Sequence, residues 1–318
     1  MDIAAIIANN LLLFHVLIII ASLAIVTKSA DLLVYSISNY AKKLGVSEYL
    51  IGFLVVSIGT ALPELIASIT GATIGQGGIV FGTNLGSNMF KIPLLGIIIL
   101  VGRKMKLGKN EIGNAPIFTF VMALLPLLLV LDGNVSRIDG AVLFAAFFIY
   151  VGKLWQGEGQ FGQMKKNVEI KSIYKDGIIF VGALVALLLS ARWLVFSSIK
   201  IADMISVSPY LVGLVVIGIG GSSPEMMVQV RSVLGKHQGI AFGNVLGSIV
   251  ANSTLVIGIS ALIKPFSMNV ATLKTTAFFM IIGVLITLAI LDKEEVNWKH
   301  GLFLIGFYIL FLISEFVF

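Results

Sequence analysis

The sequence predicts an all-α integral membrane protein of about ten transmembrane helices, arranged as two five-helix repeats of inverted topology. Three observations predict this fold class. Of the 318 residues, 58% are hydrophobic and 12% charged, and the mean hydropathy is +1.04, which is too apolar for an ordinary soluble domain. Apolar runs of about 20 residues fill nearly the whole length. The two halves of the chain also match each other in sequence.

Short polar turns separate the apolar runs and predict where each helix begins and ends. The first span covers 5–27, with a continuation to about 40 as one long helix left open. The other expected spans are 47–74, 79–102, 115–131, 138–155, 176–200, 208–234, 239–263, 270–291 and 300–317. We expect residues 1–155 to form the first half, 156–173 a cytoplasmic linker and 174–318 the second half, with no soluble domain.

The net charge of +6 is explained mainly by how the chain is oriented in the membrane. Most of the 22 Lys and Arg residues fall in alternate connections, which the positive-inside rule assigns to the cytoplasm. This predicts a protein of the cell membrane with both termini extracellular, in contact with membrane lipids. Nothing in the sequence indicates nucleic acid or an obligate protein partner, and the absence of cysteine excludes thiolate metal sites.

A shift of 161 residues, without a gap, aligns the two halves. It pairs Gly59, Pro63 and Glu64 with Gly220, Pro224 and Glu225, and the register holds over about 50 residues. Because five spans separate equivalent points, the second copy crosses the membrane in the opposite sense. Such inverted repeats are typical of transporters that bind their substrate near the bilayer midplane.

Each repeat carries a glutamate directly after a proline inside an apolar span, Glu64 in the first and Glu225 in the second. Proline removes a backbone donor and opens the helix, which frees carbonyl oxygens. An ionisable group at membrane depth is costly and is therefore a candidate functional residue. With the hydroxyls of Thr60 and Ser222 nearby, the set is all oxygen, which suits Ca²⁺, Mg²⁺ or Na⁺. A structural carboxylate satisfied by a neighbouring helix is the alternative.

The span after each glutamate contains a Gly-x-x-x-Gly pair, Gly82/Gly86 and Gly243/Gly247, which predicts close helix packing. Ser87 and Ser248 directly follow these pairs and can add a hydroxyl each to the site. Four residues further on, on the same helix face, come Lys91 in the first copy and Asn252 in the second. Asn252 suits a cation ligand or a hydrogen-bond partner. A lysine does not.

Other polar residues in the apolar spans have simpler interpretations. His15 is expected to be a packed helix residue rather than a proton relay. Lys28 and Asp31, three positions apart, are expected to form a local pair on the first helix. No arrangement of nucleophile, base and orienting group is evident, so an enzyme is not expected, and no cofactor is implied.

The paired Gly-Thr-Ala-Leu-Pro-Glu (59–64) and Gly-Gly-Ser-Ser-Pro-Glu (220–225) segments, each followed by Gly-x-x-Leu-Gly-Ser, resemble the repeats of the sodium/calcium exchanger family. The resemblance implies a ten-helix antiporter in which the long first and sixth helices slide across the core. It implies that Glu64 and Glu225 coordinate Ca²⁺ and share Na⁺ sites. The hydroxyl ligands that it implies for Na⁺ or Ca²⁺ are Thr60, Ser87, Ser222 and Ser248.

Four positions depart from the family pattern: Ala61, Gly221, Lys91 and Asn252. The last two matter most, because Glu64, Glu225 and Lys91 leave a formal charge of −1, too little for tight divalent binding in a low-dielectric site. Three hypotheses follow. Lys91 replaces one bound Na⁺ or brings H⁺ coupling, or it extends away from the site so that Glu64 and Glu225 work alone, or it pairs with a glutamate and locks the protein as a transport-inactive sensor or scaffold. A passive cation channel is a further alternative.

Overall fold

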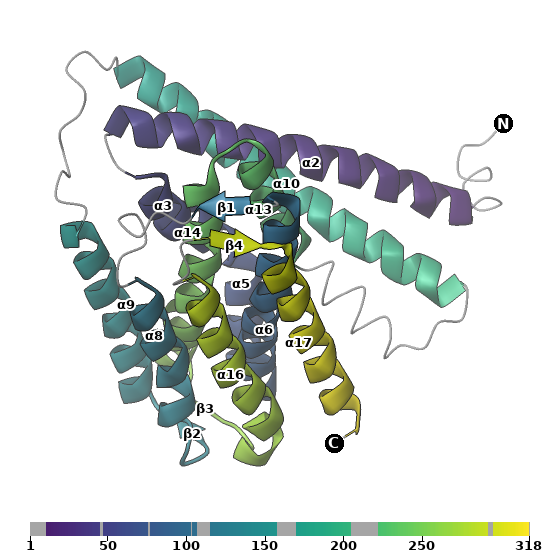
Figure 1. The fold of residues 1–318 in the computed structure, drawn as a ribbon. Coiled ribbons are helices and arrows are strands. Elements are labelled where there is room, and N and C mark those ends of the chain that lie inside the picture. Colours follow the sequence, from purple (N-terminus) through teal and green to yellow (C-terminus); the bar gives the residue numbers. More distant parts are fainter. Residues whose placement is uncertain are drawn as a thin grey trace.

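The computed structural model describes residues 11–44, 47–75, 77–102, 104–106, 115–157, 170–204, 222–291 and 295–317. These residues form a bundle of helices with two short pairs of strands, and two long helices cross one end of the bundle (Figure 1). The predicted linker 156–173 lies largely outside the described residues.

The first half of the chain contains the helices α2 (Leu11–Leu44), α3 (Glu48–Ile51), η1 (Gly52–Val56), α4 (Ser57–Thr60), α5 (Leu62–Thr73), α6 (Gly77–Gly102), α8 (Ala115–Leu129) and α9 (Arg137–Gly157), and the strands β1 (Lys104–Lys106) and β2 (Asn134–Val135). The second half contains α10 (Ile170–Met204), α13 (Ser223–Leu234), α14 (Gln238–Val250), η3 (Ala251–Val256), α15 (Ile257–Ile263), η4 (Val270–Leu273), α16 (Lys274–Leu291) and α17 (Trp298–Val317), and the strands β3 (Phe266–Ser267) and β4 (Glu295–Asn297).

The helices follow the predicted spans. Within the described residues, five helices are long and apolar enough to cross a bilayer, or six if the bent pair from Glu48 to Thr73 counts as one span. Shorter apolar helices occupy three further predicted spans, at Ile117–Leu129, Lys274–Ile290 and Trp298–Ser314. The predicted span 208–234 is described only from Ser222 onward.

The predicted break before Glu64 is present. The helix from Glu48 to Thr60 and the helix that follows it, α5, meet at an angle of 44°. Ala61 lies at the bend with φ −81° and ψ 0°, and Pro63 lies in the first turn of α5. Because proline has no N–H and its ring clashes with the carbonyl one turn back, a straight helix cannot continue through this position.

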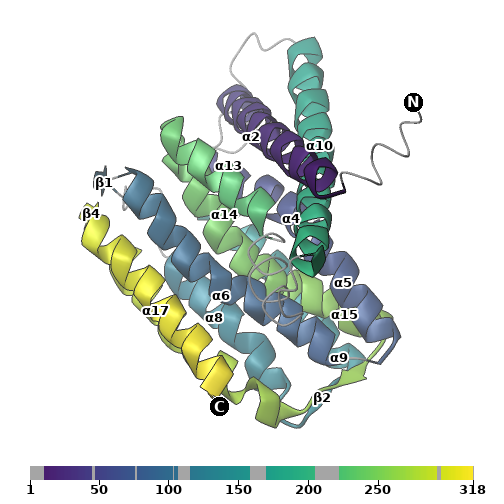
Figure 2. The same cartoon turned by 90° about the vertical axis from the view of Figure 1, so that its right-hand side faces the viewer.

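The two long helices α2 and α10 form a pair of their own across the bundle (Figure 2). Their apolar cluster, with Leu33 and Leu187, extends into the bundle at Val228 of α13. Much of the outward face of the pair is apolar and exposed, as at Leu17 and Ile178, which suits contact with lipid.

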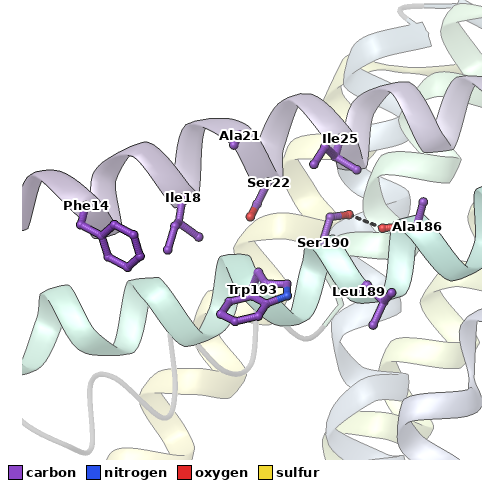
Figure 3. A pocket seen from close by; sticks show the side chains of 9 residues that line it. All are labelled: Phe14, Ile18, Ala21, Ser22, Ile25, Ala186, Leu189, Ser190 and Trp193. Carbon is purple, nitrogen blue, oxygen red and sulfur yellow. Dashed lines mark hydrogen bonds between the residues drawn. The ribbon is translucent and has the colours of Figure 1, made fainter. Parts of the chain in front are cut away.

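A cavity of about 510 Å³ opens between these two helices (Figure 3). It is lined by Phe14, Ile18, Ala21, Ser22, Ile25, Ala186, Leu189, Ser190 and Trp193. Ser190 already donates its hydroxyl to the carbonyl of Ala186 at 2.6 Å, so the lining offers little to a polar ligand. This cavity is apolar and distinct from the buried polar residues of the bundle.

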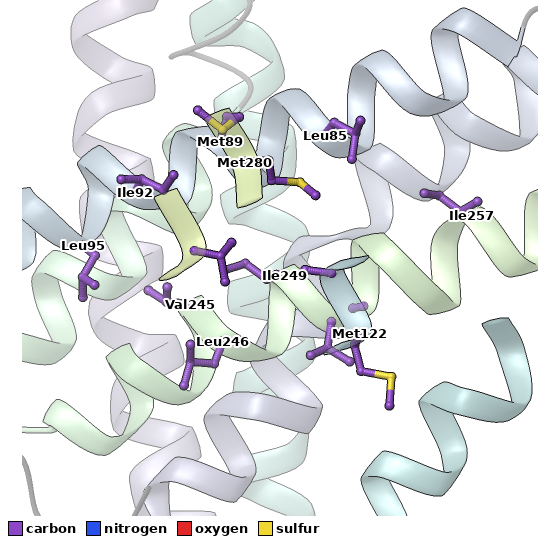
Figure 4. Close-up of a cluster of buried hydrophobic side chains, with 14 of the residues drawn as sticks. Leu85, Met89, Ile92, Leu95, Met122, Val245, Leu246, Ile249, Ile257 and Met280 are labelled. Carbon is purple, nitrogen blue, oxygen red and sulfur yellow. The ribbon is translucent and has the colours of Figure 1, made fainter. Parts of the chain in front are cut away.

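The main core surrounds α6 and α14, whose apolar side chains interdigitate with α8, α15 and α16 (Figure 4). Leu85 and Met89 of α6 and Val245 and Ile249 of α14 are at most 2% exposed. A helix that is buried on nearly all sides is expected to be apolar all round, so polar residues within α6 and α14 stand out against this background.

Close packing at the Gly-x-x-x-Gly pairs is confirmed for the second repeat. A Cβ atom at Gly243 would lie 2.8 Å from the backbone nitrogen of Phe53, and one at Gly247 would lie 2.5 Å from the Phe53 carbonyl oxygen. In the first repeat no described residue lies within 4 Å of a Cβ added to Gly82 or Gly86. Of the two pairs, the one in α14 therefore brings helices close together, against the helix that begins at Glu48.

The strand pairs mark the two ends of the bundle. At one end β1 pairs with β4, which links the end of α6 to the start of α17. At the other end β2 pairs with β3. These ends are called the β1–β4 end and the β2–β3 end below.

Candidate functional site

Glu64 lies in the first turn of α5, directly after the break in the helix. The macrodipole of a helix favours a carboxylate at this position. Its Oε1 accepts a hydrogen bond of 3.1 Å from Ser87 of α6, and its Oε2 has no partner among the described residues. The residue is 9% exposed, so the carboxylate is held inside the bundle with one oxygen available.

Glu225 occupies the equivalent place in the second repeat, in the first turn of α13 and directly after Pro224. It is 1% exposed. Its Oε2 pairs with Lys91 of α6, and its Oε1 has no partner among the described residues. The repeat register therefore predicts correctly that both glutamates begin a helix inside the bundle.

Lys91 lies in the middle of α6 with its side chain 0% exposed. Its ammonium pairs with Glu225 and donates to Ser87 Oγ at 3.1 Å. The amine therefore points toward the glutamates, and the hypothesis that it extends away from them is wrong for this conformation. A charge buried this deeply requires such a partner, because an unpaired ion in a low-dielectric interior is very costly.

These contacts form one continuous chain of hydrogen bonds between the two repeats. Lys91 joins Glu225 to Ser87, and Ser87 joins Lys91 to Glu64. The three charged groups have a formal sum of −1. No three His, Asp or Glu side chains of the described residues converge as a metal cluster would. The arrangement is thus two carboxylates bridged by a protein ammonium and a hydroxyl.

The remaining hydroxyl candidates are buried but make no bond to this chain of contacts. Thr60 Oγ1 lies 3.0 Å from the Val56 carbonyl oxygen and 3.4 Å from Asn244 Oδ1. Ser248 donates to the Val245 carbonyl oxygen of its own helix at 3.2 Å. Ser222 is buried at the N-cap of α13, without a side-chain capping bond. The structure therefore joins Ser87 to the charged chain, and does not join the other three.

Asn252 belongs to a neighbouring amide cluster. Its Nδ2 donates to Asn88 Oδ1 at 3.4 Å, and Asn88 Nδ2 donates to Ser253 Oγ at 2.8 Å. All three residues are 0% exposed. The hydrogen-bond role considered for Asn252 is present, and its Oδ1 has no partner among the described residues.

Several buried polar residues were missed by the sequence reasoning, among them Asn88, Ser253 and Asn244. Ser68 and Gln229 are two others, each one helical turn after a site glutamate. Ser68 accepts a hydrogen bond of 2.7 Å from Asn84, whereas neither amide atom of Gln229 has a partner among the described residues. The i, i+4 spacing from Glu64 and Glu225 is the signal that identifies this second pair.

Polar contacts also connect α2 to the bundle. Asp31 pairs with Arg231 of α13, so the predicted local pair between Lys28 and Asp31 is wrong. The spacing on one helix suggested that pair, but the acidic side chain faces α13 instead. Nearer the end of α2, Ser38 Oγ donates to Glu48 Oε1 at 2.6 Å.

His15 is buried, with its ring 3.3 Å from Ser197 Oγ, as expected for a packed residue.

Comparison with known proteins identifies the family. A family model described as sodium/calcium exchanger protein matches residues 14–155 and again residues 176–317. The sodium/calcium exchanger MaX1 of Methanosarcina acetivorans is 27% identical over 94% of this chain and 98% of its own length. The inner membrane protein YrbG of Escherichia coli is 31% identical over 78% of this chain and 79% of its own length.

The fold has a close structural counterpart. A solved structure of the sodium-calcium exchanger NCX_Mj, soaked with zero Na⁺ and Ca²⁺, has a TM-score of 0.83 and covers 95% of this chain at 23% identity. The likeness extends over 99% of that chain. With the two family matches, one in each half, it establishes that the chain belongs to the sodium/calcium exchanger family and is an integral membrane cation antiporter, not an enzyme.

Proposed function

We propose that this protein exchanges Ca²⁺ for Na⁺ by alternating access at a site built on Glu64 and Glu225. The observation that supports this most strongly is the bonded chain from Glu64 through Ser87 and Lys91 to Glu225. It joins the two repeats where α5 and α13 begin, and each carboxylate keeps one oxygen without a partner among the described residues. In transporters built from inverted repeats, the coupling ions typically bind at the ends of discontinuous helices where the two repeats meet.

In this proposal the Lys91 ammonium takes the place of one bound cation. It is a monovalent positive charge held against a carboxylate, as a bound Na⁺ would be. Because it is covalently attached, it is not released to either side. The site then needs fewer ions from solution to reach the same charge, so the protein exchanges fewer Na⁺ per Ca²⁺ than the same site would without the lysine.

The oxygens of Thr60, Ser222, Ser248 and Asn252 are proposed to complete the ion ligands. Oxygen donors without thiolate or imidazole are the set that suits Ca²⁺ and Na⁺. Thr60 and Ser248 now bond to carbonyl oxygens of their own helices. Ion binding is proposed to draw both hydroxyl oxygens away from those carbonyls.

The α2–α10 pair is the proposed moving part. The two helices pack mainly against each other, along an apolar cluster that reaches the bundle at Leu50 and Val228. Part-exposed polar contacts such as Asp31 with Arg231 hold α2 to the bundle.

We propose that the β1–β4 end is cytoplasmic and that both termini face outward in the cell membrane. Lys104 and Lys106 of β1 and the exposed Trp298 at the start of α17 suit a cytoplasmic interface.

The test is Ca²⁺ uptake into liposomes that contain the purified protein, driven by an outward Na⁺ gradient. Wild type is expected to take up Ca²⁺, and Glu64→Gln and Glu225→Gln are each expected to lose this activity. Asp132→Asn is the control, because Asp132 is exposed at the β2–β3 end, where its Oδ1 accepts a hydrogen bond of 2.9 Å from the Asn134 backbone N–H. Uptake that follows a pH gradient instead would indicate H⁺ coupling. Absence of uptake with either gradient would contradict exchange and favour a sensor or scaffold.

A further inference from the structure

Gln229 is a buried polar residue that no contact in the structure explains. It is 0% exposed, and neither its Nε2 nor its Oε1 has a hydrogen-bond partner among the described residues. A buried amide without partners lowers stability, because its lost bonds to water are not replaced. Because nearly all buried polar groups in proteins are hydrogen-bonded, we looked for a functional reason for this exception.

The position of Gln229 on α13 directs it toward α6. It follows Glu225 by four residues and precedes Val233 by four, so the three side chains share one face of the helix. Glu225 pairs with Lys91 of α6, and Val233 packs in the main core with α6 and α14. Gln229 lies between them on the same face, one turn beyond the ion pair.

The first repeat shows what a structural role at this position looks like. The equivalent residue, Ser68, accepts a hydrogen bond of 2.7 Å from Asn84. The residue equivalent to Asn84 in the second repeat is Val245, which cannot bond to Gln229. The second repeat thus has a polar residue at this position, Gln229, but no equivalent of Asn84, the residue that bonds Ser68 in the first repeat.

The group best placed to use this amide is the Lys91 ammonium. An ammonium has three N–H donors, and two have partners here, Ser87 and Glu225. Side chains four apart on a helix are neighbours, with Cβ atoms about 5–6 Å apart, so an ammonium at Glu225 is within reach of Gln229. A cation from solution is not expected beside Gln229, because the Lys91 ammonium already neutralises Glu225 and would repel a second positive charge.

We propose that Gln229 Oε1 and Glu225 Oε1 form a second position for the Lys91 ammonium, one helical turn along α13 from its position in the structure. In the present position the ammonium holds Ser87, which in turn bonds Glu64. In the second position it releases both residues to the transported cation. Gln229 is therefore a positioning residue that makes cation binding easier, and this role rests on the proposed exchange function.

The experiment is a titration of purified protein with Ca²⁺, with the dissociation constant read from the thermal shift. Gln229→Leu removes the second position, so the ammonium stays at Ser87 and competes with the cation. The dissociation constant is expected to rise by about fivefold or more, the lower range for coupled sites. The melting temperature without Ca²⁺ is not expected to fall, because leucine removes an unsatisfied amide.

Three comparisons separate this role from a structural one. Thr287→Val, which removes another buried hydroxyl without a described partner, is expected to leave the dissociation constant unchanged. Gln229→Glu keeps an acceptor oxygen and is expected to bind Ca²⁺ at least as tightly as wild type. In a Lys91→Met background, Gln229→Leu is expected to have no further effect, because no ammonium is left to position.

The proposal is overturned if Gln229→Leu leaves Ca²⁺ affinity unchanged, if it weakens affinity equally in the Lys91→Met background, or if wild type does not bind Ca²⁺. Wild type that binds Ca²⁺ but does not exchange it in liposomes would contradict the proposed function alone. The affinity comparison between Gln229→Leu and wild type would still decide the role of Gln229.

Discussion

The Lys91 ammonium pairs with the Glu225 carboxylate across 134 positions of sequence, and their side chains are 0% and 2% exposed. This contact joins the first repeat to the second in the first turn of α13. The same pair therefore contributes both to the stability of the bundle and to the charge of the proposed ion site, and changes to it are expected to affect both.

Replacing Lys91 by methionine is expected to destabilise the protein in the absence of cations. Removal of one partner from a buried ion pair leaves an uncompensated charge and typically costs about 3–5 kcal/mol. Added Ca²⁺ or Na⁺ should restore part of this loss, because the ion can occupy the space left by the ammonium. The measurement is the melting temperature in detergent with and without each cation.

Lys264→Met is the control for that experiment. Lys264 is exposed, and its ammonium donates to the Thr73 carbonyl oxygen at the surface. Its loss is expected to change the melting temperature little and to leave the response to cations unchanged. If the melting temperature of Lys91→Met responds to cations no more than that of this control, the Lys91 ammonium does not occupy a cation-binding position.

Ser87→Ala and Ser248→Ala are expected to differ, although the two serines are equivalent in the repeats. Ser87 links Lys91 to Glu64, whereas Ser248 bonds the Val245 carbonyl of its own helix. Loss of the Ser87 link removes a hydrogen bond to a charged group, worth about 1.5–3 kcal/mol. Thermal unfolding should show a larger loss of stability for Ser87→Ala, and equal losses would contradict the asymmetry.

Gly243→Ala is expected to destabilise the protein by about 1–3 kcal/mol, the usual cost of overpacking. Its Cβ would lie 2.8 Å from the Phe53 backbone nitrogen and closer still to the Tyr49 carbonyl oxygen. Gly182→Ala in α10 meets nothing within 4 Å among the described residues and should be neutral or stabilising. Comparison of the two melting temperatures checks the packing of α14 against the helix that begins at Glu48.

Exchange of the charges at Asp31 and Arg231 tests the contact between α2 and α13. The pair is part-exposed, so Asp31→Arg alone is expected to cost only about 0.2–1 kcal/mol from the lost attraction, with some added repulsion. Its effect on transport should be larger if α2 moves against the bundle. Arg231→Asp in the same protein should restore the transport rate in the liposome assay. A double variant as slow as the single one would show that the ion pair does not act in transport.

The repeat explains why so much of the site was predictable. One alignment predicts that Glu64 and Glu225 begin equivalent helix segments, and it identifies Lys91 as the position at which the two copies differ in charge. A polar residue in an apolar span is costly wherever it lies, so its importance can be read without the fold. The bend at Ala61 follows from Pro63 for the same local reason.

The partners of these residues were less predictable, because they depend on how distant helices pack. Asp31 has Lys28 three positions away in sequence, but in space it faces Arg231, 200 positions further along the chain. Asn88 and Ser253 meet only because α6 and η3 are neighbours. The direction of the Lys91 amine likewise depends on the approach of α13 to α6, which the sequence pattern does not specify.

The most direct test of the account is the number of Na⁺ exchanged per Ca²⁺, measured from the reversal potential of Ca²⁺ flux in liposomes at several Na⁺ gradients. If the Lys91 ammonium stands in for one bound Na⁺, Lys91→Asn should exchange one more Na⁺ per Ca²⁺ than wild type. The same number in both proteins would contradict the proposal that Lys91 takes the place of a transported cation.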